Sequence, residues 1–281
     1  MLTTKAKITI AAALSGFVRA ARTAVGAGSD DVLVKRDGIA WHLDLREGID
    51  FAIFLGLYER STTRAIRRWV RPDSVVLDIG ANIGAHTLEL ARQVGSRGKV
   101  FAFEPTFFAH SKLVQNLALN PGLGAIVKSE QLMLASCDKR EVAFQIYSSW
   151  PLVRADSLHP NHLGRLQPTD GARTLSLDTY LRRSGVSRVD FMKLDVDGYE
   201  CEVLEGARHC LGTFRPMILM ELAPYVLCER GASLAQLVDI LNRSKYCFAQ
   251  LDGESLSIDV TTLGGKIAEG ASINVIARPT T

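Results

Sequence analysis

The stretch SVVLDIGANIG, residues 74–84, decides the fold of this chain. An apolar, β-branched run ends in Asp-Ile-Gly, and a turn spaced by Gly80 and Gly84 follows it. Residues 85–92 then have a helix-forming composition with apolar residues at helical spacing. The pattern predicts a buried parallel strand, a tight turn and a helix. Glycine lets the backbone turn sharply and approach a ligand closely, and the helix N-terminus offers free N–H groups.

The turn favours a nucleoside ligand over a diphosphate. It lacks the third glycine of the dinucleotide fingerprint and the Lys-Ser/Thr ending of a P-loop. The second predicted strand, residues 98–103, is followed by Glu104. A carboxylate at that strand end is positioned to accept hydrogen bonds from two ribose hydroxyls. A glycine turn and a ribose-binding acid without a phosphate grip suit S-adenosylmethionine.

Three further motifs lie downstream: VDFMKLDVDGYE at 189–200, VLEG at 203–206 and RPMILME at 215–221. Together with DIGANIG and with FEP at 103–105, they closely resemble the FkbM-type family of S-adenosylmethionine-dependent methyltransferases. The resemblance covers roughly residues 70–225. The chain has Asp197 where the family usually has Glu and Leu194 where it often has Ile. Neither departure changes the charge.

Alternating strand and helix patterns predict an α/β fold for most of the chain. The resemblance implies a Rossmann-like class I methyltransferase, with a mostly parallel seven-stranded sheet, helices on both faces and an antiparallel C-terminal strand pair. We divide the chain into a basic amphipathic segment (1–29), a hairpin and helix cap (30–70) and the methyltransferase domain (71–281). Strands are expected at 75–79, 99–103, 125–134, 141–147, 189–194, 216–221, 246–251 and 272–277. Helices are expected at 84–94, 107–119, 199–210 and 233–244, and another begins near 174–181.

Four other segments have a local prediction. Residues 32–45 read as a β-hairpin that turns at Asp37-Gly38, and residues 48–70 read as mostly helical. Residues 148–170 are loop-rich and are expected to form a binding loop. Asn116 and Asn120-Pro121 are interpreted as a helix end.

Bulk properties exclude several classes of protein. The net charge of +3 is too small to indicate nucleic-acid binding. The 5 cysteines are scattered without a Cys-x-x-Cys pair, so free thiols in a reducing compartment are expected rather than disulfides or a zinc site. No apolar run reaches the ~18 residues of a membrane-spanning helix.

Residues 1–29 contain no Asp or Glu but carry Lys5, Lys7, Arg19 and Arg22 on a helical apolar pattern. Four alternatives stay open for this segment: a helix packed on the domain, a basic amphipathic helix at a membrane surface, a transit peptide and a signal peptide. Secretion would separate the chain from a cytoplasmic cofactor, so the cytoplasm is the predicted compartment, with peripheral membrane contact as an alternative.

Parallel strands present their ligand sites beyond their carboxyl ends, where this chain places several acids. The cofactor-binding candidates are Asp78, Gly80, Ala81, Asn82, Ile83, Gly84, Glu104, Pro105, Leu134, Ala135 and Asp195. The catalytic candidates are Asp195, Glu221 and Glu200. Asp195 could anchor the cofactor amino group, act as base or ligate a metal, Glu221 could bind an acceptor hydroxyl or form a salt bridge, and Glu200 could equally cap a helix.

Two charged or polar residues have competing interpretations. Lys193 interrupts an apolar strand, and pairing with a nearby acid is the simpler account of a buried lysine. His86 reaches the site or is an ordinary half-buried histidine. A metal site at Asp195 with Asp197 or Glu221 is an alternative, but no His/Cys cluster supports it and no metal is predicted.

The sequence therefore predicts an S-adenosylmethionine-dependent methyltransferase. The resemblance implies transfer to oxygen, on a hydroxyl of a sugar, a glycan or a small natural product. The rivals are a nicotinamide-dependent oxidoreductase, which the missing third glycine disfavours, and a catalytically silent scaffold, which the intact Gly80, Gly84, Glu104 and Asp195 disfavour. The spacing does not identify the acceptor, the oligomeric state or a need for metal.

Overall fold

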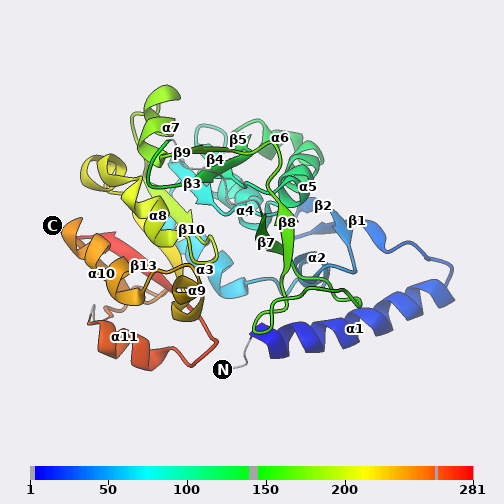
Figure 1. The fold of residues 1–281 in the computed structure, drawn as a ribbon. Coiled ribbons are helices and arrows are strands. Elements are labelled where there is room, and N and C mark those ends of the chain that lie inside the picture. The colour runs from blue at the N-terminus through cyan, green and yellow to red at the C-terminus, as the bar shows by residue number, and fades with distance from the viewer. Residues whose placement is uncertain (1–3, 139–144, 257–258, 281) are drawn as a thin grey trace.

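The computed structural model describes residues 4–138, 145–256 and 259–280, and its centre is a seven-stranded sheet (Figure 1). The strand order is β12-β13-β11-β10-β3-β4-β5. All neighbours pair in parallel except β13, which runs antiparallel to both β11 and β12. The strands span Val75–Ile79 (β3), Lys99–Phe103 (β4), Val127–Glu130 (β5), Phe191–Leu194 (β10), Met217–Leu222 (β11), Tyr246–Ala249 (β12) and Ile273–Pro279 (β13). This is the sheet that the resemblance implies.

The register of the central strands brings the predicted site residues to one edge. Ile79 at the end of β3 pairs with Phe103 of β4 and with Leu194 of β10. Leu194 in turn pairs with Met220 of β11. The residues that follow, among them Glu104 and Asp195, therefore leave the sheet side by side.

Helices cover both faces of the sheet and bury its apolar side chains. One face packs on α3 (Arg60–Trp69) and α4 (Ala85–Val94), through buried residues such as Ile66 and Leu90. The other packs on α7 (Leu177–Arg183), α8 (Glu200–Glu205) and α10 (Leu234–Arg243), through residues such as Leu204 and Leu237. Because both faces are covered, the central strands β3, β4, β10 and β11 are mainly apolar and do not alternate.

The N-terminal segments form a separate layer beside the sheet. The predicted hairpin is confirmed as β1 (Asp31–Arg36) and β2 (Ile39–Asp44). The predicted helical stretch after it is two helices, α2 (Gly48–Phe54) and α3, with a break between them. The long helix α1 (Thr4–Ala24) runs along the outer edge of this layer (Figure 1). Within the described residues, no helix is long and apolar enough to cross a membrane.

Helix α5 (Phe107–Ala118) is tied to the hairpin by two asparagines. The Asn116 amide oxygen accepts the His42 N–H, and its nitrogen donates to the Ile83 carbonyl. Asn120 accepts the Ala40 N–H and donates to the Ala40 carbonyl. Asn120 does precede Pro121 at the start of the short α6 (Pro121–Gly124), but these side chains join the N-terminal layer to the core as well as marking a helix end.

Several element boundaries differ from the prediction. The predicted strand 125–134 is split: β5 ends at Glu130, and β6 (Leu132–Leu134) leaves the sheet to pair with β9 (Arg173–Leu175). In the predicted strand 141–147, residues 141–144 lie outside the described residues. The strand β7 (Gln145–Ser149) follows them and pairs with β8 (Arg165–Pro168) inside the predicted loop.

Some helices also differ from the prediction. The predicted helix 199–210 ends at Glu205, and a π-helical turn, η1 (Cys210–Phe214), follows. The sequence analysis did not anticipate α9 (Pro224–Glu229) or α11 (Val260–Lys266). Both are short, so they carry too few helical repeats for periodicity to detect.

Candidate active site

The glycine turn after β3 needs glycine for steric reasons. Gly80 has φ of +81°, and a Cβ there would lie 1.8 Å from the Asp195 carbonyl oxygen. Gly84 has φ of +92°, and a Cβ there would lie 2.7 Å from the Leu113 side chain. The backbone of the turn thus packs against the end of β10 at Gly80 and against α5 at Gly84. Among the described residues, no side chain caps the start of α4, so the N–H groups of its first turn remain available to a ligand.

Glu104 fastens this turn to the end of β4. Its Oε2 accepts the Asn82 N–H at 3.0 Å, and its Oε1 accepts the Thr106 N–H at 2.9 Å and the Thr106 hydroxyl at 2.6 Å. Burial raises the pKa of the Glu104 carboxyl, and the Thr106 and Asn82 hydrogen bonds oppose that rise. A carboxylate has about four acceptor positions, so about one on Oε2 remains for a ligand.

Lys193 lies buried at the centre of the site and is paired, as the simpler account predicts. Its Nζ donates to the Gly80 carbonyl at 2.9 Å and lies 3.2 Å from Asp195 and 3.7 Å from Asp78. Burial by itself would lower the pKa of Lys193, but the neighbouring carboxylates of Asp195, Asp78 and Glu59 outweigh it and raise the pKa. The ammonium therefore stays charged and holds the glycine turn to two strand ends.

Three carboxyl groups gather at the ends of β10 and β11. Burial, then the nearby Asp195, raise the pKa of Asp197 and of Glu221 well above the usual values. The Ser272 hydroxyl donates to Glu221. Asp195, by contrast, is matched by the Lys193 ammonium and keeps part of its side chain exposed to the cavity. The arrangement sets Asp195, paired with the Lys193 ammonium, beside two carboxyl groups that favour the neutral form.

Tyr58 and Glu59, in the cap segment, also belong to the site, although no sequence pattern indicated it. Glu59, at the start of α3, lies 2.9 Å from His86 Nε2, and Tyr58 packs on the same ring at a centroid distance of 5.3 Å. Burial would raise the pKa of Glu59, but the His86 contact and Lys193 lower it to about 2. His86 is buried and its Nδ1 has no hydrogen-bond partner within the described part of the chain. A Tyr-Glu pair on a break between helices gives no periodic signal that could have found it.

Three non-glycine residues around the site have a left-handed backbone. The φ values are +31° at Glu59, +47° at Asn82 and +48° at Asp197. Such a conformation costs about 1–3 kcal/mol per residue and persists where the surrounding structure imposes it. Their occurrence on three separate segments of one cavity is typical of a functional site.

Beyond Asp195 the cavity has an aromatic and cationic wall. Tyr147, Trp150 and Tyr199 line it together with Arg230. The Arg230 guanidinium lies 4.8 Å from the Tyr199 ring centre and 6.0 Å from that of Tyr147. Its Nε is buried without a hydrogen-bond partner, and no carboxylate of the described residues forms a salt bridge with it. This wall offers flat apolar faces and an uncompensated cation.

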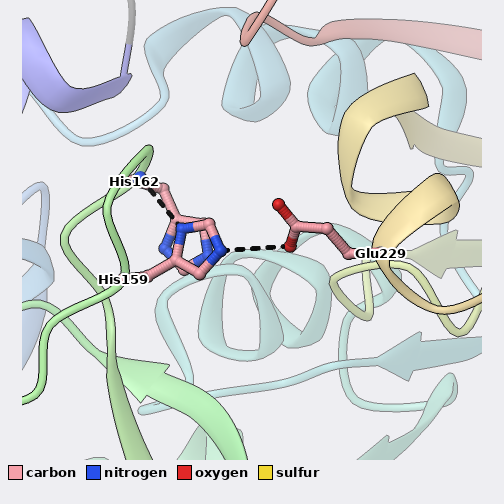
Figure 2. A group of neighbouring side chains, drawn as sticks. All are labelled: His159, His162 and Glu229. Atoms are coloured by element: carbon pink, nitrogen blue, oxygen red, sulfur yellow. Dashed lines mark hydrogen bonds and ion pairs between the residues drawn. The ribbon is translucent and has the colours of Figure 1, made fainter.

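Beside that wall, His159, His162 and Glu229 form a cluster (Figure 2) whose nitrogen and oxygen atoms lie within 4.8 Å of one another. The two rings stack at 3.8 Å. Nδ1 of His159 accepts the N–H groups of Asn161 and His162, and Nδ1 of His162 accepts that of Gly164. Each neutral ring thus carries its proton on Nε2, and His159 Nε2 lies 3.1 Å from Glu229.

This pattern fits a hydrogen-bonded contact between two segments better than a metal site. A metal-ligating histidine uses the lone pair of one nitrogen and donates a proton from the other. Here the second nitrogen accepts instead. Burial and the neighbouring His159 lower the pKa of His162 to about 4, which keeps the ring neutral. The cluster joins the 150–164 loop, and thereby the aromatic wall, to the end of α9 (Figure 2).

The cavity has a volume of about 620 Å³ and brings most of the predicted residues together. Those that line it are Gly80, Ala81, Asn82, Glu104, Pro105, Leu134, Asp195 and Glu221. His86 and Lys193 line it too.

Five predicted residues lie outside the lining: Asp78, Ile83, Gly84, Ala135 and Glu200. Asp78 is fully buried and accepts the Thr87 hydroxyl at 2.6 Å. Glu200 accepts the N–H groups of Val196 and Gly198, and burial raises its pKa to about 7. These bonds hold the turn before α8, whose N-cap position is Tyr199 and has no side-chain cap bond within the described residues.

The sequence model of the family described as "Methyltransferase FkbM domain" matches residues 78–246, which is more than half of the chain. The chain belongs to the FkbM methyltransferase family. Its activity is thus S-adenosylmethionine-dependent methyl transfer, and the oxidoreductase and silent-scaffold alternatives are not favoured. The matched span contains the glycine turn, Glu104, Asp195 and Glu221, whereas Glu59 and helix α1 precede it.

Curated relatives of this FkbM protein are methyltransferases. The "2-O-methyltransferase NoeI" of Sinorhizobium fredii is 26% identical over 183 residues, which cover 61% of this chain and 72% of that protein. The "Hexuronic acid methyltransferase AglP" of Haloferax volcanii is 26% identical over 156 residues, covering 54% of this chain and 58% of that protein. The "Methyltransferase sdnD" of Sordaria araneosa is 29% identical over 155 residues, which cover 47% of this chain and 59% of that protein. The chain thus matches less than two-thirds of the length of the last two.

The residues of the cavity fit the cofactor of the family. The glycine turn admits close backbone approach, Glu104 has a remaining acceptor position, and the first turn of α4 and the His86 ring present unpartnered polar groups. S-adenosylmethionine supplies an electrophilic methyl group on a cationic sulfur, and the carboxylate side of the cavity complements that charge.

Proposed function

We propose that this FkbM protein methylates a hydroxyl oxygen on a sugar, a glycan or a small natural product. The observation that carries the proposal is the arrangement of Asp195. It lies 3.2 Å from the Lys193 ammonium, is partly open to the cavity and is located between the glycine turn and the aromatic wall. Methyl transfer to a hydroxyl needs a group that takes up the hydroxyl proton, and a positioned carboxylate can do so. The printed names of NoeI and AglP support oxygen and sugar acceptors.

The roles of the remaining residues follow from their contacts. Glu221 and Asp197, held toward the neutral form, would hydrogen-bond the acceptor without competing for its proton. Lys193 positions Asp195 and the glycine turn. Glu104 would accept a hydrogen bond from a ribose hydroxyl, and the N–H groups at the N-terminus of α4 would donate to the carboxylate of the cofactor. The cytoplasm stays the predicted compartment because the methyl donor is found there.

The first experiment is calorimetric titration with S-adenosylhomocysteine. The wild type should bind, and Glu104→Ala should weaken binding by about 10- to 100-fold, because a hydrogen bond to a charged group contributes about 1.5–3 kcal/mol. Glu130→Ala is the matched control, because Glu130 ends the neighbouring strand β5 outside the cavity lining. Failure of the folded wild type to bind would contradict the proposed cofactor site. Equal losses in both variants would contradict the ribose contact.

Arg230 favours an acidic acceptor. The uncompensated guanidinium on the acceptor side of the cavity matches a carboxylate, as in a uronic acid. We expect methyl transfer to a methyl glucuronoside to show a KM about 10- to 100-fold higher in Arg230→Met than in wild type, with kcat little changed. The exposed Arg208→Met serves as control. Methyl glucoside, which lacks the carboxylate, is the comparison acceptor. If Arg230→Met changes the ratio of the two KM values no more than Arg208→Met does, Arg230 does not select the acceptor.

A further inference from the structure

Helix α1 packs on the N-terminal layer through Ile8, Ala11, Ala12 and Val18, yet it also leaves large apolar side chains exposed on its outer side. On the inner side, the buried Ser15 hydroxyl donates to the Leu45 carbonyl at 2.6 Å, and Arg19 makes two hydrogen bonds of 2.6 Å to Asp30. These contacts fix the rotation of the helix about its axis. The outer side of a surface helix in a globular protein is normally polar, which is not the case for α1.

The outer side carries an apolar stripe. Ile10, Leu14 and Phe17 follow at helical spacing, and Ile10 is 58% and Phe17 73% exposed. Between and beyond them the exposed residues are small and apolar: Ala13, Ala20, Ala21 and Ala24. The stripe is therefore a continuous apolar face that no described part of the chain covers.

The charge of the same segment indicates what covers it. Residues 1–29 contain no acid, and the first acid of the chain, Asp30, is paired with Arg19. Lys5 and Lys7 are exposed, and the described residues form no salt bridge with them. Exposed lysines that flank an apolar helix face complement an anionic lipid surface, at about 1 kcal/mol for each basic residue. A helix that cannot cross a bilayer can still lie in its surface.

The stripe also borders the entrance of the catalytic cavity. Lys7, Ile10 and Leu14 line the cavity from α1, and Leu57, which is 57% exposed, lines it from the segment after α2. Figure 1 shows α1 running along the outer edge of the molecule next to α2. A surface that covers the stripe would therefore face the cavity entrance as well.

We propose that α1 is an in-plane membrane helix that seats the protein on an anionic bilayer and turns the cavity entrance toward it. Ile10, Leu14 and Phe17 enter the interfacial region, and Lys5 and Lys7 contact anionic headgroups. The binding follows from α1 alone and does not depend on the proposed acceptor. Together with the proposed function, it places the acceptor at the bilayer surface.

Flotation of the full chain with vesicles tests the proposal. Vesicles of phosphatidylcholine with about one-third phosphatidylglycerol should bind the wild type, and pure phosphatidylcholine vesicles or high salt should reduce binding. Phe17→Ser should weaken binding by about tenfold or more, because burying a Phe side chain contributes about 1.5–3 kcal/mol. Lys5→Glu should weaken binding to the anionic vesicles only.

Phe107→Ser is the matched control, because Phe107 is 62% exposed on α5 and lies outside the stripe. S-adenosylhomocysteine titration of each variant separates loss of membrane binding from loss of the cofactor site. A wild type that stays unbound with anionic vesicles would overturn the proposal. So would equal losses in Phe17→Ser and Phe107→Ser, or a concentration-dependent dimer that Phe17→Ser abolishes, which would assign the stripe to a second copy of the chain.

Discussion

Lys193→Met is expected to lower the free energy of unfolding by about 3–5 kcal/mol, because it removes the cation from a buried pair and leaves the carboxylates behind. Asp78 and Asp195 lie 3.7 and 3.2 Å from the ammonium, and its loss also leaves the Gly80 carbonyl without its donor. Urea unfolding of the two proteins measures the difference. Methionine has a similar length, so a cavity contributes little.

The loss should also depend on pH. The pKa of Lys193 is raised in the folded wild type, so the ammonium contributes its full stabilisation below the ordinary lysine pKa of about 10.4 and loses it as the pH rises further. The deficit of the variant should therefore persist across pH 5–8 and shrink only in strongly alkaline solution. Adding Asp78→Asn to Lys193→Met should recover part of the loss. Lys99→Met, at an exposed position on β4, is the control. A loss below about 1 kcal/mol at pH 8 would contradict the assigned role.

Asp195→Asn is expected to lower kcat for methyl transfer by about 10²- to 10⁴-fold, the range attributed to a positioned general base. Asparagine keeps the shape of the side chain but cannot take up the hydroxyl proton. The measurement is transfer of labelled methyl groups to the acceptor, with kcat and KM determined over a range of pH.

Two controls separate catalysis from structure. Asp239→Asn changes an exposed surface aspartate paired with Arg243 and should leave kcat unchanged. Urea unfolding of Asp195→Asn shows whether the weakened pair with Lys193 has unfolded the protein at the assay temperature. A folded Asp195→Asn variant with kcat within about threefold of wild type would exclude Asp195 as the base.

The order of strands and helices in the core could be predicted from the sequence, and for a local reason. Strands buried on both faces read as short apolar runs, and Gly80 marks a turn that no other residue could occupy. The acids Glu104 and Asp195 follow directly on such runs, so the parallel sheet itself brings them to one edge.

The predicted boundaries of strands and helices were wrong where a pairing with a distant segment decides the conformation. The run from 125 to 134 begins and ends with apolar residues and looks like one strand. However, Leu132–Leu134 pairs with Arg173–Leu175, about forty residues away, and leaves the sheet. In the same way, local reasoning interprets Asn120 as a helix end, whereas its amide also binds the backbone of Ala40 in the hairpin.

The sequence by itself determined the turn, the strand ends and hence the cofactor side of the cavity, because each depends on residues close together in the chain. Only the tertiary structure decided that Glu59 meets His86 and that Arg230 and Tyr147 form one wall. It also decided that the side of α1 with Ile10, Leu14 and Phe17 faces outward. Those facts depend on how separate elements pack and rotate against one another, and neither packing nor rotation leaves a pattern within a single segment.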